Sequence, residues 1–171
     1  HKLSHQHLYT KFWIVNIDEM MLDGIYVKDI HNYPVPVLIS NFINDFNFDG
    51  IKRFYQVQNH CKNFIRAWHG HIKEAKYVYV VKGSILFSVV PIPSTPYSDE
   101  LGQNIKQEPK KYILSSDKPS ILYVPPNHAN GFMTLTDDAI VQFFSTSTLD
   151  ESKGDDIRFA YDTWNIWNVE Y

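Results

Sequence analysis

The stretch that decides the fold lies in the middle of the chain, where residues 64–90 read FIRAWHGHIKEAKYVYVVKGSILFSVV. Val, Ile, Tyr and Phe dominate it, and these β-branched and aromatic side chains favour strands over helices. Gly83 interrupts the run and predicts a tight turn. We therefore expect three short strands, of which the last two form a hairpin around Gly83: 64–68, 77–81 and 85–90.

Similar strand-like segments lie on both sides of this stretch. Many short strands with little helical pattern predict a sandwich or a barrel. From Ile92 to Lys111, three prolines and several charges predict a long surface loop, and spaced apolar residues over 37–48 predict one short helix. The further expected strands are 9–16, 51–58, 112–114, 121–124, 131–135 and 140–145.

Composition and charge narrow the class of protein. A chain of 171 residues is typical of one domain. The net charge of -3 gives no basic surface field for nucleic acid. The single Cys61 excludes an internal disulfide framework and suits a reducing compartment, and no apolar run is long enough to cross a membrane. We therefore expect a cytoplasmic protein that binds neither nucleic acid nor a membrane.

Four groups that are cationic, or can become so, stand close together in the sequence: Arg66, His69, His71 and Lys76. In a strand, His69 and His71 project from the same face. Positive groups at such spacing repel one another unless an anion or a carboxylate balances them. The cluster therefore predicts a binding pocket, and the simpler alternative is a pair of solvated histidines at a barrel mouth.

The spacing of His69 and His71 also resembles the start of the metal-binding motif of cupins, in which a Glu follows on the next strand. Lys76 stands at that Glu position and opposes a divalent cation, because an ammonium offers positive charge instead of a ligand oxygen. Asn130 stands where the fourth ligand His would be, and the possible substitutes are His128 and Glu74. We therefore expect a cupin with no metal and no other cofactor.

The expected architecture is an all-β cupin (jelly-roll) barrel with an N-terminal arm and little helix. Residues 1–50, including the short helix, would form the arm and pack on the barrel. Residues 51–171 would form the barrel domain itself.

Over residues 51–168 the sequence resembles the dTDP-4-dehydrorhamnose 3,5-epimerase family of nucleotide-sugar cupins. The resemblance rests on four segments: RAWH at 66–69, KYVYVVKG at 76–83, ANGFMTLTD at 129–137 and DIRFAYDTWNIW at 156–167. It implies a metal-independent epimerase that acts alpha to the ketone of a 4-keto nucleotide-diphosphate sugar, in deoxysugar or polysaccharide precursor synthesis. It also implies a homodimer.

The resemblance suggests a role for each cationic group. His69 would be the base that removes the alpha proton, Lys76 would stabilise the enolate, and Arg66 would hold the nucleotide phosphates. Gln56 and Gln58 loosely match polar positions that meet the nucleotide. The other expected pocket residues are His71, Tyr123, His128 and Asn130.

The sequence departs from the family at two positions of the site. Phe143 stands where the family carries its acid, a Tyr, and phenylalanine has no exchangeable proton. Asn130 replaces the family's His before Gly-Phe. Epimerisation at a single centre with a different acid is therefore one hypothesis, and the candidate acids are Tyr55, Tyr123 and His71.

Two alternatives stay open. The segments IKRFY at 51–55 and RAWHGHIK at 66–73 also resemble the nucleotide-sugar 3,4-ketoisomerases, in which both His residues are functional. That family has Gln where Lys76 stands and lacks the Gly-Phe…Ile-x-Trp pattern. The absent acid at Phe143 leaves a third hypothesis, a cupin that binds a sugar nucleotide without turning it over.

Two features near the C-terminus have simpler interpretations. Trp164 and Trp167 could stack on a nucleotide base, but aromatic residues there more often close a barrel end or a dimer interface. The spacing of the acidic cluster does not fit an EF-hand and predicts a solvated loop. The cluster comprises Asp150, Glu151, Asp155 and Asp156.

Overall fold

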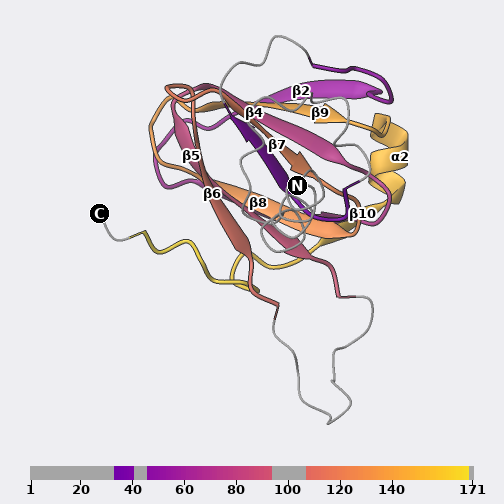
Figure 1. Cartoon of the computed structure of the whole chain (residues 1–171). Coiled ribbons are helices and arrows are strands. Elements are labelled where there is room, and N and C mark those ends of the chain that lie inside the picture. The colour runs from indigo at the N-terminus through magenta and orange to yellow at the C-terminus, as the bar shows by residue number, and fades with distance from the viewer. Residues whose placement is uncertain (1–32, 41–45, 94–106, 170–171) are drawn as a thin grey trace, which may run out of the picture.

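The computed structural model describes residues 33–40, 46–93 and 107–169. They form two five-stranded antiparallel sheets that face each other across one core (Figure 1). The first sheet has the strand order β1-β7-β4-β9-β2, and the second has the order β10-β3-β8-β5-β6. The expectation of an all-β fold is therefore confirmed.

Short strands make up nearly all of the regular structure. The first sheet contains β1 (Val37–Ser40), β2 (Arg53–Gln58), β4 (Lys76–Lys82), β7 (Ser120–Val124) and β9 (Ile140–Ser145). The second contains β3 (Ile65–His71), β5 (Ser84–Pro91), β6 (Lys110–Ser115), β8 (His128–Thr134) and β10 (Asp156–Arg158). One short helix, α2 (Leu149–Gly154), joins β9 to β10. No helix among the described residues is long and apolar enough to cross a membrane.

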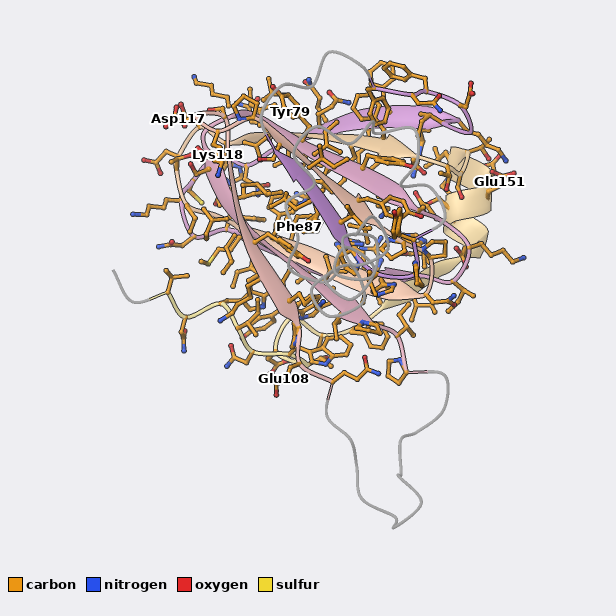
Figure 2. The ribbon with its side chains drawn as sticks, viewed as in Figure 1. Tyr79, Phe87, Glu108, Asp117, Lys118 and Glu151 are labelled. Carbon is orange, nitrogen blue, oxygen red and sulfur yellow. The ribbon has the colours of Figure 1, made fainter. Side chains whose placement is uncertain are left out.

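The apolar core lies between the two sheets. Phe87 of β5 points into this space (Figure 2). It meets Phe132 of β8 and Phe143 of β9, and the three ring centroids are 6.2–6.5 Å apart. Val78 and Val80 of β4 belong to the same cluster, in which every side chain is almost completely buried. These residues fill one end of the barrel, so polar groups are left to the other end.

Two further apolar clusters cover the outer faces of the sheets. On the first sheet, Tyr77 packs on Tyr123 with ring centroids 5.1 Å apart. On the second sheet, Trp68 is fully buried against Trp164 and Trp167 of the C-terminal segment, at centroid distances of 5.2 and 5.0 Å. The two C-terminal tryptophans therefore close the outer face of a sheet and do not reach the barrel interior.

The strands expected from residue 51 onwards are all present, as β2 to β9. Gly83 turns the β4–β5 hairpin with a φ of 75°, as expected. The helix expected over 37–48 is wrong for residues 37–40, which form β1 and pair with β7. Both faces of β1 contact apolar clusters, and a run that is apolar on both faces does not distinguish a strand from a helix.

Two expectations concern residues 1–50 as a whole. The strand expected at 9–16 lies outside the described residues. The division into an arm and a barrel domain stays a prediction, although β1 shows that residues 37–40 add a strand to the first sheet.

The expectation of a loop for the acidic cluster was wrong, because its residues lie in α2, at the end of α2 and in β10, whereas Asp150, Glu151 and Asp156 are exposed as expected. Thr148 caps α2 and forms a reciprocal capping box with Glu151, which Figure 2 labels on the helix. Asp155 accepts backbone hydrogen bonds from residues 72, 73 and 74, and Asp156 begins β10. The Thr148-x-x-Glu151 spacing is a helix-start signal that the sequence does contain.

Candidate active site

The polar end of the barrel interior contains most of the residues that the sequence singled out. His69 and His71 of β3 face this interior, because Gly70 between them faces the outer layer. A Cβ atom on Gly70 would lie 2.8 Å from the side chain of Ile92 and 3.2 Å from that of Phe159. The same-face prediction for the two histidines is therefore confirmed.

Strand β8 adds two further polar side chains to the interior. Asn130 pairs in register with His69, and His128 pairs with His71. Both lie on the same face of β8 as Phe132 of the core, since Ala129 between them packs in the outer cluster. The amide of Asn130 donates to the backbone carbonyl of His69 at 3.2 Å.

Lys76 enters the interior from the opposite sheet. It lies on the same face of β4 as Val78 and Val80 of the core, and only 6% of it is exposed. Burial lowers the pKa of Lys76, and the neighbouring Glu74 carboxylate opposes this only in part. A buried ammonium is costly without a partner, so it is suited to meet negative charge that develops on a ligand.

Glu74 is the buried carboxylate at the centre of this end of the barrel. Its Oε1 accepts hydrogen bonds from Ser145 at 2.5 Å and from Arg53 at 3.0 Å, and its Oε2 accepts one from Ser152 at 2.7 Å. Burial alone would raise the pKa of Glu74, but Lys76 and the two serines hold it below its usual value. Glu74 therefore stays ionised.

His71 lies next to this carboxylate. Its Nδ1 atom is 3.1 Å from Oε2 of Glu74 and 3.8 Å from Oδ2 of Asp155. The distance to Glu74 is that of a hydrogen bond, but the ring N–H is not aligned with the oxygen. Burial and then Lys76 lower the pKa of His71, and Glu74 raises it. His71 is therefore neutral at pH 7.

His69 has a different neighbour. The guanidinium of Arg158, on β10, contacts Nδ1 of His69 closely, and the same Nη1 atom is 3.2 Å from Nε2. Arg158 is in turn held by Asp156, whose Oδ2 accepts from Nε at 2.6 Å. Burial, followed by Arg158 and Lys76, lowers the pKa of His69 to about 4. This imidazole is also neutral at pH 7.

Tyr55 brings a phenol to the same end. Its ring stacks on that of Phe143, and the guanidinium carbon of Arg53 lies over the Tyr55 ring, 4.9 Å from the ring centroid. Burial, followed by the charge of Glu74, raises the pKa of Tyr55 to about 12. Tyr55 thus keeps its proton at neutral pH and can donate it.

The structure places three of the remaining expected residues, Gln56, Gln58 and Tyr123, away from this group. Gln56 and Gln58 are exposed on β2, on the face opposite Tyr55. Tyr123 lies on the face of β7 opposite the core, where it packs on Tyr77. Arg66 differs from these three, because it pairs in register with Phe132 of the core and therefore lies on the inward face of β3. Its side chain is exposed, its guanidinium donates to Oδ1 of Asn59 at 3.3 Å, and its charge contributes to the lowered pKa of His69.

Sequence reasoning missed three members of the site. Arg158 and Asp156 come from β10, a three-residue strand that pairs Arg158 with His69 and Asp156 with His71. Such a short polar strand carries no periodic signal. Arg53 precedes Tyr55 by two residues on β2, so strand alternation could have placed both on one face.

Among the described residues, no group of three or more His, Cys, Asp or Glu side chains is arranged to hold a metal ion. The site instead combines two neutral imidazoles, the buried amino group of Lys76, an ionised carboxylate and a protonated phenol. Such a set can take a proton from a C–H bond, stabilise the oxyanion that results, and return a proton.

Comparison with solved structures supports a fold of the cupin type. The epimerase of Mycobacterium tuberculosis superposes with a TM-score of 0.52 at 18% identity, over 64% of this chain and 52% of its own length. The dTDP-4-dehydrorhamnose 3,5-epimerase of Bacillus anthracis, solved with TDP and pyrophosphate, superposes with a TM-score of 0.53 at 22% identity, over 66% of this chain and 61% of its own length. A sugar 3,4-ketoisomerase of Thermoanaerobacterium thermosaccharolyticum, solved with TDP, superposes with a TM-score of 0.50 at 22% identity, over 70% of this chain and 72% of its own length.

These identities establish the fold alone, and the chain spans only 52% and 61% of the length of the two epimerases. The expected cupin (jelly-roll) fold is nevertheless confirmed by the likeness. No curated protein matches the chain by sequence. The family model described as dTDP-4-dehydrorhamnose 3,5-epimerase matches residues 43–169, which is most of the chain. The chain therefore belongs to the dTDP-4-dehydrorhamnose 3,5-epimerase family.

Proposed function

We propose that this protein is a metal-independent epimerase that inverts a carbon next to the ketone of a 4-keto nucleotide-diphosphate sugar, with dTDP as the nucleotide. Family membership supports the reaction class. The observation that carries the proposal is that two neutral imidazoles, His69 and His71, share the barrel interior with the buried ammonium of Lys76.

The chemistry requires only proton transfers. A neutral imidazole takes the proton alpha to the ketone, and the electron pair of the broken C–H bond moves into the enolate, whose negative charge collects on the carbonyl oxygen. The Lys76 ammonium stabilises that oxygen. When the ketone re-forms, an acid on the opposite face delivers a proton to the carbon, and Tyr55 is the phenol available for this step.

Metal independence rests on the position of Lys76. It occupies the place at which the resemblance to metal cupins puts a carboxylate ligand, and its positive charge supplies the stabilisation that a cation would give to an enolate. Arg66, exposed on β3, is suited to the diphosphate because a guanidinium presents paired donors to phosphate oxygens.

We also propose that the protein is a homodimer. The outward face of β2, which is the edge strand of its sheet, exposes 70% of Phe54, and the nearby Phe48 is 60% exposed. Gln56 and Gln58 lie on the same outward face. Light scattering on the full chain tests this proposal, and a monomeric mass at micromolar concentration would contradict it.

A 3,4-ketoisomerase is the second candidate, favoured by the inward orientation of both His69 and His71. That reaction would move the ketone from C4 to C3 and leave the configuration of C5 unchanged. A cupin that binds the sugar nucleotide without turning it over is the third, motivated by Phe143.

One incubation separates the three candidates. The protein is mixed with dTDP-4-keto-6-deoxyglucose in deuterated water, and NMR follows C3, C4 and C5. We expect deuterium at C3 or C5 together with the inverted isomer. A C3 ketone without inversion indicates the ketoisomerase instead. The third outcome is that dTDP binds, but neither a dTDP sugar nor the corresponding GDP sugar exchanges a proton or gives a new product. That outcome would leave only the non-catalytic binder.

A further inference from the structure

We propose that His71, oriented by Glu74, is the base that removes the substrate proton, and that His69 is a hydrogen-bond donor to the substrate. The inference deepens the proposed function and rests on it. It reverses the roles that the family resemblance suggests, in which His69 would be the base, and it gives Glu74 a positioning role that the resemblance does not contain.

His71 is paired with the carboxylate of Glu74. Nδ1 of His71 lies 3.1 Å from Oε2 of Glu74. An imidazole whose Nδ1–H faces a carboxylate keeps its lone pair on Nε2, which is the arrangement of a general base in a His–carboxylate pair. Nε2 of His71 is 4.0 Å from Oδ1 of Asp156, too far for a hydrogen bond. Asp156 therefore does not draw the ring proton to Nε2 by accepting a hydrogen bond from it.

Glu74 is immobilised as an anion. Its side chain is fully buried, and Ser145, Ser152 and Arg53 all donate to it from three different elements. The Nδ1–H of His71 is out of line with Oε2, so the pair forms a hydrogen bond only when the ring rotates. The carboxylate itself is held in place by its three other donors. When His71 becomes an imidazolium, Glu74 supplies the adjacent negative charge.

His69 is poorly placed to act as a base, because a cation lies against its ring. Nη1 of Arg158 contacts Nδ1 of His69 closely and lies 3.2 Å from its Nε2, and this positive charge opposes the uptake of a proton. A guanidinium can only donate, and Nδ1 is the nearer nitrogen, so we infer that Nδ1 accepts from Arg158 and that Nε2 carries the proton of the neutral ring. Asp156 anchors Arg158 in this position at 2.6 Å.

Charged and titratable groups from several elements surround His71. Besides burial, its pKa responds to Lys76 on β4, to Glu74 before β4, and to the carboxylates of Asp155 and Asp156. The further titratable neighbours are His69 on the same strand and His128, which pairs with His71 from β8. Lys76 lowers the pKa of His71 and Glu74 raises it. Loss of the Glu74 charge therefore shifts the pKa of His71 downward.

The transfer itself is balanced. The alpha C–H bond breaks, the proton goes to Nε2 of His71, and the electron pair passes through the enolate to the oxygen next to Lys76. Reprotonation of the carbon from the opposite face completes the inversion. The base loses its proton to solvent or to the acid, so no other reactant is needed.

The experiment compares His71→Gln, His69→Gln and Glu74→Gln with the unaltered protein and with Asp138→Asn. Asp138 is a matched control, since it is an exposed carboxylate paired with Lys82 at the other end of β4. Exchange of the alpha proton into deuterated water should fall about 10²–10⁴-fold in His71→Gln. It should fall less than about tenfold in His69→Gln, whose main effect is a raised KM.

The pH profile identifies a positioning role for Glu74. In Glu74→Gln, kcat should fall by up to about 10⁴-fold, as when the carboxylate that orients a catalytic His is replaced by its amide. The acidic limb of kcat/KM should also move to lower pH, because the pKa of His71 falls. A carboxylate that only supports the fold would leave this limb in place. The inference is wrong if His69→Gln abolishes exchange while His71→Gln retains it, or if the limb does not move.

A measurement on the unaltered protein separates this inference from the proposed function. Nitrogen-15 NMR of the labelled imidazoles should show His71 with its proton on Nδ1 and His69 with its proton on Nε2. The opposite tautomers would overturn the inference even if the protein is an epimerase. The expected tautomers without any exchange of substrate protons would instead contradict the proposed function.

Discussion

Tyr55 of β2 stacks on Phe143 of β9, with ring centroids 4.9 Å apart and ring planes only 9° from parallel. Phe143 occupies the position at which the family resemblance puts a Tyr as the acid. A phenol is still present in this region, because Tyr55 supplies one from the neighbouring strand β2. Register pairing across the sheet sets Tyr55 directly opposite Phe143. Burial raises the pKa of Tyr55 to about 12, which keeps its hydroxyl protonated.

The first prediction concerns this phenol as the acid. In Tyr55→Phe, the base still removes the alpha proton and returns it to the same face, while delivery from the other face is lost. We expect the inverted product to form about 10²-fold more slowly, with deuterium still entering the unchanged substrate. Tyr161→Phe is the control, since Tyr161 is 58% exposed. Equal losses of exchange and inversion in Tyr55→Phe would assign the acid elsewhere.

The second prediction separates binding from chemistry. Lys76→Met removes the buried ammonium and should lower kcat about 10²–10³-fold, with dTDP affinity changed less than about threefold. Arg66→Met should have the converse effect, since loss of a hydrogen bond to a charged group weakens dTDP binding about 10–100-fold. Calorimetry and steady-state kinetics measure the two effects. Lys82→Met, at an exposed position on the same strand as Lys76, controls for loss of a lysine.

The third prediction follows from the buried neutral histidines. The pKa of His69 is about 4 in the folded protein and near 6.5 in the unfolded chain. Between these values the unfolded chain binds more protons, so the free energy of unfolding decreases as the pH falls from 6.5 to 4. His69 accounts for at most about 3 kcal/mol of that decrease. Burial lowers the pKa of His71 and of His128 as well, so they act in the same direction.

Urea unfolding at a series of pH values tests this dependence. The decrease below pH 6.5 should be shallower in His69→Gln than in the unaltered protein. His60→Gln provides the control, because His60 is exposed. If the two variants followed the same curve, the buried state of His69 would not contribute to acid unfolding.

The sequence predicted the β-strands well and the site only in part, for physical reasons. Strands β2 to β9 carry β-branched and aromatic residues bounded by turn residues, and these signals are local. The inward orientation of His69 and His71 follows from the period of a strand. The groups that shift the pKa values of the two histidines do not follow from that period. Glu74, for example, is held by Ser145 and Ser152, which lie 71 and 78 residues further along the chain.

Arg158 illustrates the same limit. It contacts His69 across 89 residues, through a three-residue strand whose position depends on the capped helix before it. Gln56 and Gln58 illustrate the reverse case, since they match a polar pattern but face away from the interior. Residue type and spacing thus indicated which strands build the site, whereas the pairing of charges became visible only with the sheet register.

The fourth prediction concerns the close approach of β8 to the irregular part of β3. A Cβ atom on Gly131 would lie 2.5 Å from Cβ of Ala67, 3.0 Å from its Cα, and 3.1 Å from the carbonyl oxygen of Arg66. Two of these three atoms belong to the backbone, so the contact cannot be relieved by a side-chain rotation. The register between β3 and β8 shifts at this point, between Arg66 and His69.

Gly131→Ala should therefore push β3 away from β8 and lower the free energy of unfolding by about 1–3 kcal/mol, the usual range for overpacking. Because the displaced segment leads directly into His69, kcat should fall as well. Gly154→Ala is the matched control, since a Cβ there meets nothing within 4 Å. Urea unfolding of both variants measures the difference, and equal stability for the two would show that the strands can separate at Gly131 without cost.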